Sequence, residues 1–342
     1  MRRGLVGLIG LIMVIAASGA TYNMLALRHL RNSYPPPGKF YTVEGHRMHV
    51  SCTGSGSPAV VLESGLAEGF LVWGKVQPAL SRVTRVCSYD RAGLGWSESV
   101  PGPRDSRHIA DQLHALLSQA HIDGPLVLVG HSAGGLYIRA YATRFTNDVV
   151  GMVFVDASTP GQENKLPASV AALDQHGTFQ IAVFQTMIAL GIPRILGQCE
   201  TPPPGFEATA NLWRANACAP AYVTAFRRES DALPQSMAQA ARTSSYGNLP
   251  IMVVSQDPNL PRPRQLPATV SASDWQLGIT SHDAMQQDLL HLSIRSRRII
   301  AKGSRHYIHF DRPQLLVREV STFIQHIRSG DIGPENGTTV TE

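Results

Sequence analysis

The stretch Leu126-Val127-Leu128-Val129-Gly130-His131-Ser132-Ala133-Gly134-Gly135 decides the fold of this chain. Its first four residues are apolar, the pattern of a strand that is buried on both faces of a parallel sheet. The strand runs into a Gly-x-Ser-x-Gly turn, and an apolar helical stripe follows over residues 136–141. A serine in such a turn adopts a strained backbone conformation, and only glycine flanks let the strand and the helix pass so closely. The sequence therefore predicts Ser132 as a nucleophile at the end of a buried strand.

Three further segments resemble the α/β-hydrolase superfamily, in the order and at the spacing of that family. Residues 60–66, Val-Val-Leu-Glu-Ser-Gly-Leu, are similar to its strand and oxyanion turn. Residues 90–97 match its D-R-x-G-x-G-x-S loop, and residues 303–309 are similar to its histidine loop. The resemblance implies an α/β-hydrolase fold, with a mostly parallel eight-stranded sheet, helices on both faces and a helical cap inserted after the sixth strand.

The order of the patterns divides the chain into segments. Strand and helix patterns alternate through residues 34–156 and again through 245–328, which predicts that these two segments form one core. Residues 157–244 read as helical and are interrupted by Pro202-Pro203-Pro204-Gly205, so we expect them to form the cap. Residues 329–342 are polar and rich in Gly and Thr, and we expect a disordered tail there.

The N-terminal segment, residues 1–33, is directed to a membrane by its composition. Arg2 and Arg3 precede residues 4–27, which carry no charged side chain and are long enough to cross a bilayer of about 30 Å. We expect a membrane anchor, a signal peptide cleaved near Ser18-Gly19-Ala20, or a buried core helix. The first two alternatives place the enzyme outside the cytoplasm, either in the periplasm or at the cell surface, or secreted after cleavage.

Charge and cysteine usage limit the partners. The net charge of +5 comes from scattered Lys and Arg residues, which argues against a nucleic-acid partner. No Cys and His spacing is typical of a zinc site, and we expect neither a metal nor a cofactor. Cys52 and Cys87 lie on strands that are neighbours in the resembled fold, and Cys199 and Cys218 lie in the cap; whether each pair forms a disulfide or packs as free thiols stays open.

A serine hydroxyl needs a neighbouring imidazole to take its proton. Among 13 histidines, His306 follows the last core strand and a Gly303-Ser304 turn, so it is our predicted base. His309 is the competing candidate, although packing at the start of the last helix explains it better. In the resembled fold the acid follows the sixth or the seventh strand, which leaves Asp156 as the preferred residue and Asp257 as the alternative.

The resemblance also assigns the residues around the nucleophile. The backbone N–H groups of Leu66 and Ala133 are the expected oxyanion hole. Ser64 and Gly65 stand where the family usually has His-Gly, and with His131 they are the expected substrate-binding residues. Asp90 and Arg91 are expected to form an ion pair that braces the turn below the site.

Three function classes follow from these assignments. The preferred one is a serine hydrolase that cleaves carboxylic esters, on small to medium apolar ester substrates, because every element for acyl transfer is present in order. The alternatives are an amide, peptide or carbon–carbon bond hydrolase, and a non-catalytic binding protein on the same fold. Ser132 argues against an epoxide hydrolase or a haloalkane dehalogenase, which resemble this fold but use an aspartate at that position. The apolar stretch 179–196 either lines a pocket mouth or packs the cap onto the core.

Overall fold

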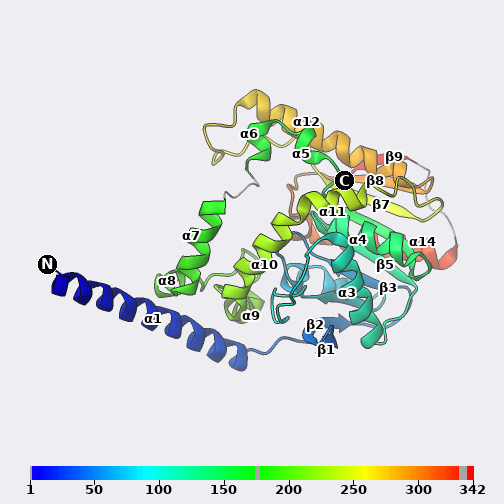
Figure 1. The fold of residues 1–342 in the computed structure, drawn as a ribbon. Helices are drawn as coiled ribbons and strands as arrows, with labels where there is room; N and C mark the ends of the chain where they lie inside the picture. The colour runs from blue at the N-terminus through cyan, green and yellow to red at the C-terminus, as the bar shows by residue number, and fades with distance from the viewer. Residues whose placement is uncertain (1, 174–177, 331–336) are drawn as a thin grey trace.

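A nine-stranded sheet is the centre of the computed structural model, which describes residues 2–173, 178–330 and 337–342 (Figure 1). Its strand order is β1-β2-β4-β3-β5-β6-β7-β8-β9; β2 pairs antiparallel with β1 and β4, and all other pairs are parallel. The strands are β1 (Lys39–Val43), β2 (His46–Thr53), β3 (Ala59–Glu63), β4 (Val86–Tyr89), β5 (Leu126–His131), β6 (Val149–Val155), β7 (Ile251–Gln256), β8 (Ser296–Ala301) and β9 (Thr338–Thr341). The predicted mostly parallel α/β sheet is confirmed, with one strand more than expected.

Helices cover both faces of the sheet because the central strands are apolar on both sides. Leu128 packs with α3 (Ser106–Gln119), α4 (Gly134–Arg144) and η4 (Leu289–Leu292), whereas Val127 and Val129 pack with α2 (Gln77–Leu80) and α14 (Pro313–Ser329). Between β3 and β4 the chain forms the short 3-10 helix η1 (Phe70–Trp73), which is separated from α2 by a break. Gly74 and Pro78 explain the break, since both residues disfavour a continuous helix.

The segment between β6 and β7 forms the helical cap that the sequence predicts. Its helices are α5 (Gln162–Lys165), α6 (Ala168–Ala171), α7 (Thr178–Ala189), α8 (Ile192–Ile195), η3 (Glu207–Thr209), α9 (Ala210–Asn216), α10 (Pro220–Asp231) and α11 (Leu233–Ala240). The cap packs on the core through α11, which contacts α3 and α4, while α7 packs on α10. The remaining helices are η2 (Thr146–Asp148), α12 (Ala272–Asp288) and α13 (Ile308–Asp311).

Both cysteine pairs are disulfide-bonded, which answers the question that the sequence left open. Cys52 and Cys87 face each other in the register of β2 and β4, and their sulfurs are joined. Cys199 and Cys218 join two parts of the cap, the segment after α8 and the start of α10.

The N-terminal segment forms one long helix, α1 (Arg2–Ser33), which reaches well out from the body of the molecule (Figure 1). Within the described part of the chain, Arg3–Ser33 is the helix whose length and apolar composition suffice to cross a membrane. Its large apolar side chains between Leu5 and Ile15 are exposed in the isolated molecule.

The tail predicted to be disordered is partly ordered. Residues 331–336 lie outside the described residues, but Thr338–Thr341 pair with β8 as the edge strand β9. The backbone N–H of Lys302 donates to the carbonyl of Glu342 at 2.7 Å, and the Glu342 carboxylate pairs with Arg318. The prediction was wrong because the composition of the tail does not show that an unpaired edge of β8 lies nearby. β-branched residues such as Thr and Val readily add a strand to such an edge.

The cap disulfide generates a stability prediction. Because Cys199 and Cys218 close a loop with a sequence separation of 19, replacing both with serine should lower the free energy of unfolding by about 3 kcal/mol. Urea denaturation followed by circular dichroism measures the change. The control is the unmodified chain with its disulfides reduced, and equal stability of the variant and the oxidised chain would contradict the prediction.

Candidate active site

The turn after β5 has the strained geometry that a nucleophile elbow requires. Ser132 has a φ of 52°, in the left-handed region that side chains other than glycine rarely adopt. A Cβ atom on Gly130 would lie 2.6 Å from the carbonyl oxygen of Gly134, and one on Gly134 would lie 2.6 Å from that of Glu63. Both glycines are therefore needed for the close passage of the strand, the turn and the neighbouring loop.

The carboxylate of Asp156 joins the loop after β6 to the loop after β8. Asp156 follows β6, the strand next to β5, and its side chain is fully buried. Its Oδ2 lies 2.7 Å from Nδ1 of His306. Its Oδ1 accepts a hydrogen bond from the backbone N–H of Gln256 at 2.9 Å and lies 3.0 Å from Nε2 of His282, on α12. One buried carboxylate thus holds two imidazole rings.

The charge of Asp156 is stabilised by these partners. Burial alone would raise the pKa of its carboxyl, but the rings of His282 and His306 and their hydrogen bonds hold that pKa well below its usual range. The carboxylate is therefore ionised at neutral pH and can orient a ring through its Nδ1–H.

Asp257 lies nearby with a different set of partners. Its carboxylate accepts hydrogen bonds from the backbone N–H groups of Gly303 and Asn259, both at 2.9 Å. Its own N–H donates to the carbonyl of Ser304, also at 2.9 Å. These contacts brace the turn that leads into His306, and it is Asp156 whose carboxylate touches the imidazole.

His131 lies beside the elbow and contacts the histidine loop. Its Nε2 lies 3.1 Å from the carbonyl oxygen of His306, and its Nδ1 lies 3.2 Å from the carboxylate of Glu68. The rings of His131 and His306 have centroids 4.7 Å apart. Because His131 directly precedes Ser132, these contacts bring the elbow and the loop of His306 together at one edge of the sheet.

Among the described residues, Glu68, His131 and His309 have ligand atoms within 4.8 Å of one another, close enough to hold a metal ion. The two histidines are buried and Glu68 is half-buried. Glu68 and His131 already bond each other, and Glu68 also accepts from the N–H of Gly65. His309 is fully buried, its ring nitrogens have no hydrogen-bond partner in the described part of the chain, and burial lowers its pKa well below the usual range. We assign His309 to packing, since its ring lies against Trp73 and His131.

The loop after β3 presents the backbone group expected to stabilise an oxyanion. The N–H of Gly65 donates to Glu68 and that of Ala67 to Glu229, each at 2.9 Å. The backbone N–H groups of Leu66 and Ala133 donate to no acceptor within the described part of the chain. The hydroxyl of Ser64 is turned inward, donating to the carbonyl of Gly69 and accepting from Trp73, so it holds the loop.

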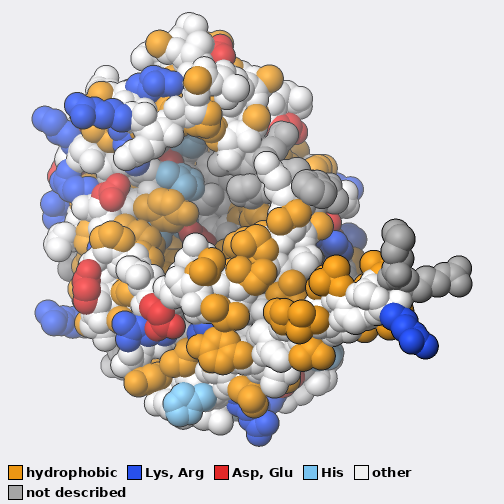
Figure 2. All heavy atoms as spheres, turned by 90° about the vertical axis from the view of Figure 1, so that its left-hand side faces the viewer, with side chains coloured by type: hydrophobic (Ala, Val, Ile, Leu, Met, Phe, Trp, Pro, Cys, Tyr) orange, Lys and Arg blue, Asp and Glu red, His pale blue; other side chains and the backbone are white. Residues whose placement is uncertain are grey.

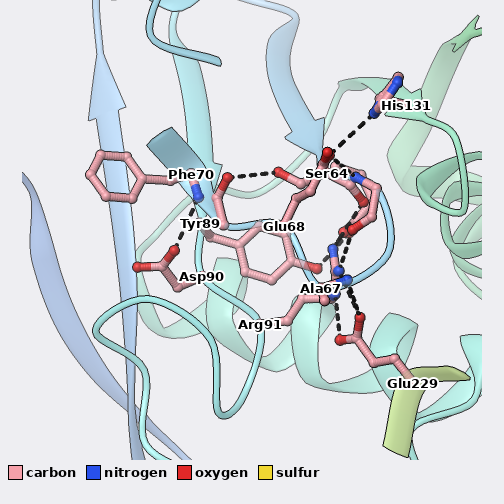
Figure 3. Close-up of polar contacts among 12 residues, drawn as sticks. Ser64, Ala67, Glu68, Phe70, Tyr89, Asp90, Arg91, His131 and Glu229 are labelled. Carbon is pink, nitrogen blue, oxygen red and sulfur yellow. Dashed lines mark hydrogen bonds and ion pairs between the residues drawn. The ribbon is translucent and has the colours of Figure 1, made fainter. Parts of the chain in front are cut away.

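Arg91 fixes this loop from below (Figure 3). Its guanidinium donates to the carbonyls of Ser64 and Gly65 at 2.9 and 2.6 Å. It also forms ion pairs with Glu63 at 2.7 Å and with Glu229 of the cap helix α10 at 2.8 Å. The network joins the core, the loop of Leu66 and the cap.

The expected ion pair between Asp90 and Arg91 is a wrong prediction. Asp90 pairs with His49 at 2.8 Å and accepts from the backbone N–H of Phe70 (Figure 3). The two residues directly follow β4, and their side chains contact different groups: Asp90 contacts His49 and Phe70, whereas Arg91 contacts Glu63 and Glu229. Each side chain therefore has its own set of partners.

The pKa values of Glu63 and Glu229, the two acidic partners of Arg91, shift in opposite directions. Burial raises the pKa of the Glu63 carboxyl, and the attraction of Arg91 only partly offsets it. Burial also favours a higher pKa for the Glu229 carboxyl, but the charges of Arg91 and Arg104 outweigh this effect and lower the pKa. Glu229 therefore carries the charge that compensates the buried guanidinium.

A pocket of about 360 Å³ lies between the cap and the loop of Leu66. Ala67 and Glu68 line it from the core side, Tyr307 from the histidine loop, and Trp213 and Tyr222 from the cap. The lining contains neighbours of the site, Glu68 and Tyr307, but neither Ser132 nor His306.

Sequence reasoning missed two residues of the site, His282 and Glu229. His282 lies inside a helix, not after a strand, and no pattern distinguishes it from the other histidines. Glu229 lies in the cap, where the family resemblance is weakest. A weak signal did exist for Glu229, because a carboxylate on an otherwise buried helix face needs a partner.

Comparisons with known proteins agree with this fold. The family model described as the alpha/beta hydrolase fold matches residues 58–313. An AB hydrolase superfamily protein of Gibberella zeae is 24% identical over 286 residues, covering 79% of this chain and 87% of that protein. An uncharacterized protein of Schizosaccharomyces pombe is 34% identical over 203 residues, covering 51% of this chain but only 37% of its own length.

A solved structure, that of epoxide hydrolase CorEH, superposes with a TM-score of 0.62 at 19% identity and covers 85% of this chain and 99% of that one. At this identity the likeness concerns the fold alone. The nature of the nucleophile has to come from the residues of the site.

The network of Arg91 predicts a large effect of Glu229 on stability. Glu229→Ala would leave a buried guanidinium with one charged partner fewer, so we expect a loss of about 3–5 kcal/mol in the free energy of unfolding. The matched control is Asp231→Ala on the same helix, whose pair with Arg227 is exposed and should contribute less than about 1 kcal/mol. Chemical denaturation of both variants tests this, and equal losses would contradict it.

Proposed function

The chain belongs to the alpha/beta hydrolase fold family, and on that basis we propose that it is a serine hydrolase that cleaves carboxylic esters through an acyl-enzyme. The observation that carries the proposal is the contact of His306 with the buried carboxylate of Asp156, at the same sheet edge as the elbow of Ser132. A nucleophile, a base and an orienting acid from three different loops are the set that acyl transfer requires.

In the first half of the reaction, Oγ of Ser132 attacks the carbonyl carbon of the ester while its proton passes to Nε2 of His306. The N–H groups of Leu66 and Ala133 donate to the oxyanion that forms. Collapse of this intermediate breaks the bond to the alcohol oxygen, which takes the proton from His306. The alcohol leaves, and the acyl group stays on Ser132.

In the second half, water replaces the alcohol. His306 takes a proton from the water as its oxygen attacks the acyl carbon, and the proton returns to Oγ of Ser132 as the carboxylic acid leaves. Asp156 keeps its charge throughout and stabilises the imidazolium of His306. The serine distinguishes this scheme from that of the structurally similar epoxide hydrolases, which the family resemblance associates with an aspartate.

The first experiment asks whether Ser132 is reactive and which substrates it accepts. The purified chain should react covalently with a fluorophosphonate probe and should hydrolyse p-nitrophenyl esters. Ser132→Ala should abolish both signals. Hydrolysis of p-nitroanilides with no activity on the esters would favour an amide hydrolase, and absence of probe labelling in the folded protein would favour a binding protein.

The three proposed catalytic residues should behave as one unit. We expect Ser132→Ala and His306→Ala each to lower kcat by about 10³-fold or more, with little further loss in the double variant. Steady-state kinetics on one ester, with the three variants compared, measures this. Losses that multiply would mean that the two residues act independently.

The choice of acid is tested by neutral replacements of the same shape. Asp156→Asn should lower kcat by about 10³–10⁴-fold because the imidazole loses its orienting charge. Asp257→Asn is the matched control, because Asp257 braces the turn that leads into His306. It should lower kcat far less. A crippled Asp257→Asn enzyme with an active Asp156→Asn enzyme would reverse the assignment.

His282 should act as a positioning residue through Asp156. His282→Ala removes one of the two rings on the carboxylate, and we expect kcat to fall about tenfold with KM nearly unchanged. His282→Gln keeps a donor near the same place and should restore most of the rate. If both variants kept full kcat, the ring would have no part in orienting Asp156.

The helix α1 and the disulfides support a proposal about the location of the protein. We propose that α1 anchors the chain in a membrane, with Arg2 and Arg3 on the cytoplasmic side and the folded part on the other side. The two disulfides support this side, because such bonds persist in oxidising compartments.

A further inference from the structure

The membrane helix α1 is held on the cap by buried polar contacts. Asn23 is 1% exposed, and its side-chain amide donates to the carbonyl of Ile188 at 2.9 Å and accepts from Arg194 at 2.8 Å. Gly19 lies so close to the cap that a Cβ there would be 2.3 Å from the carbonyl oxygen of Leu190. The orientation of α1 relative to α7 and α8 is therefore set by specific contacts.

The length of α1 then sets the depth of the cap. A helix needs about 20 residues to cross a hydrocarbon core of about 30 Å. Counted from the residue after Arg3, this length ends near Asn23, at the level of the contacts with Ile188 and Arg194. A bilayer spanned by α1 would thus meet the cap at α8.

The part of the cap that would meet the bilayer is apolar. Figure 2 shows hydrophobic side chains gathered on the face from which α1 extends. We define the cap face by five large apolar residues that are each at least 41% exposed: Val183, Phe184, Ile195, Leu196 and Tyr222. Also on α7, Ile181 and Ile188 are buried with Val223 of α10. One helix therefore packs the cap and also presents apolar side chains to the outside.

The cap face opens into the interior of the cap. A pocket of about 470 Å³ is lined by Ile181, Phe184, Tyr222 and Phe226, among others. Tyr222 also lines the 360 Å³ pocket beside Glu68 and Tyr307. Tyr222 therefore separates the pocket at the cap face from the pocket beside the active-site loops.

We propose that the cap face docks on the lipid bilayer spanned by α1 and that its pocket admits acyl chains of lipid-soluble esters directly from the membrane. The proposal rests on the proposed membrane anchor and ester hydrolysis, and it adds the surface, its partner and the substrate class. The bilayer is the occupant that fits, because the large apolar residues of α1 from Leu5 to Ile15 are exposed and the same helix reaches the cap face at Gly19, where a Cβ would lie 3.9 Å from Ile195.

The docking is tested without any reference to activity. The four native cysteines are all in disulfides, so a cysteine introduced at Ile195 or Phe184 supplies a single free thiol for an environment-sensitive NBD label. The control position is Ser118, exposed on α3. The full chain is reconstituted in vesicles of phosphatidylcholine and phosphatidylglycerol with or without doxyl-labelled lipid.

We expect blue-shifted NBD emission and quenching by doxyl lipid at positions 184 and 195, and neither at 118. Emission typical of water at both cap positions would overturn the proposal. A blue shift without quenching would mean that protein, such as a second copy of this chain, covers the cap face, and this too would overturn it.

The route for substrate is tested by activity in the same vesicles. Phe184→Ser should lower kcat/KM about tenfold for a C12 p-nitrophenyl ester, since the long acyl chain loses apolar contacts in the pocket, and should leave the C2 ester unchanged. Leu277→Ser is the matched control, because Leu277 is 56% exposed on α12, outside the cap face. Equal effects on both esters would overturn the lipid-side entrance. Loss of all ester hydrolysis with normal NBD quenching would refute the proposed function and leave the docking surface standing.

Discussion

A guanidinium that is buried away from water is tolerated only where several acceptors and a compensating charge surround it, and Arg91 meets this condition by joining three parts of the protein. Its partners are Glu63 at the end of β3, the carbonyls of the loop that contains Leu66, and Glu229 of the cap. The conformation of the loop that contains Leu66, the position of α10 and the end of β3 therefore depend on one another. A cap that leaves its place would also release the N–H of Ala67 and loosen the loop that presents Leu66.

Asp156, like Arg91, is a single buried charged residue that joins several parts of the protein. Parallel strands end at one edge of the sheet, so loops that are distant in sequence meet there. Asp156 follows β6 and reaches His306 after β8, and it also engages His282 from α12. Its burial makes these contacts strong, because a low local dielectric penalises any carboxylate that lacks partners. A precise site thus arises from residues that no local pattern links.

The positions of α1 and α7 in the fold relate two apolar segments that are separate in the sequence. In sequence, α1 and α7 are two separate apolar stretches, each with several ordinary explanations. In the fold, the side chain of Asn23 on α1 donates to the carbonyl of Ile188 on α7 and so joins the two helices. Under the proposed docking, the protein meets its proposed ester substrates at the membrane surface. Specificity would then depend on the cap as much as on the catalytic residues.

The sequence by itself determined the features that local geometry dictates. Glycines on both sides of Ser132, an apolar strand before it and a helix after it leave one structure for the elbow, and the order of strands and helices specifies the mostly parallel sheet. Tertiary structure decided what depends on contacts between distant residues. The pairing of Arg91 with Glu229 instead of Asp90, the second ring on Asp156 and the pairing of residues 338–341 with β8 all needed the position of a partner in space. Side-chain partners and free strand edges leave no periodic trace in a sequence, which is why these features emerged only from the fold.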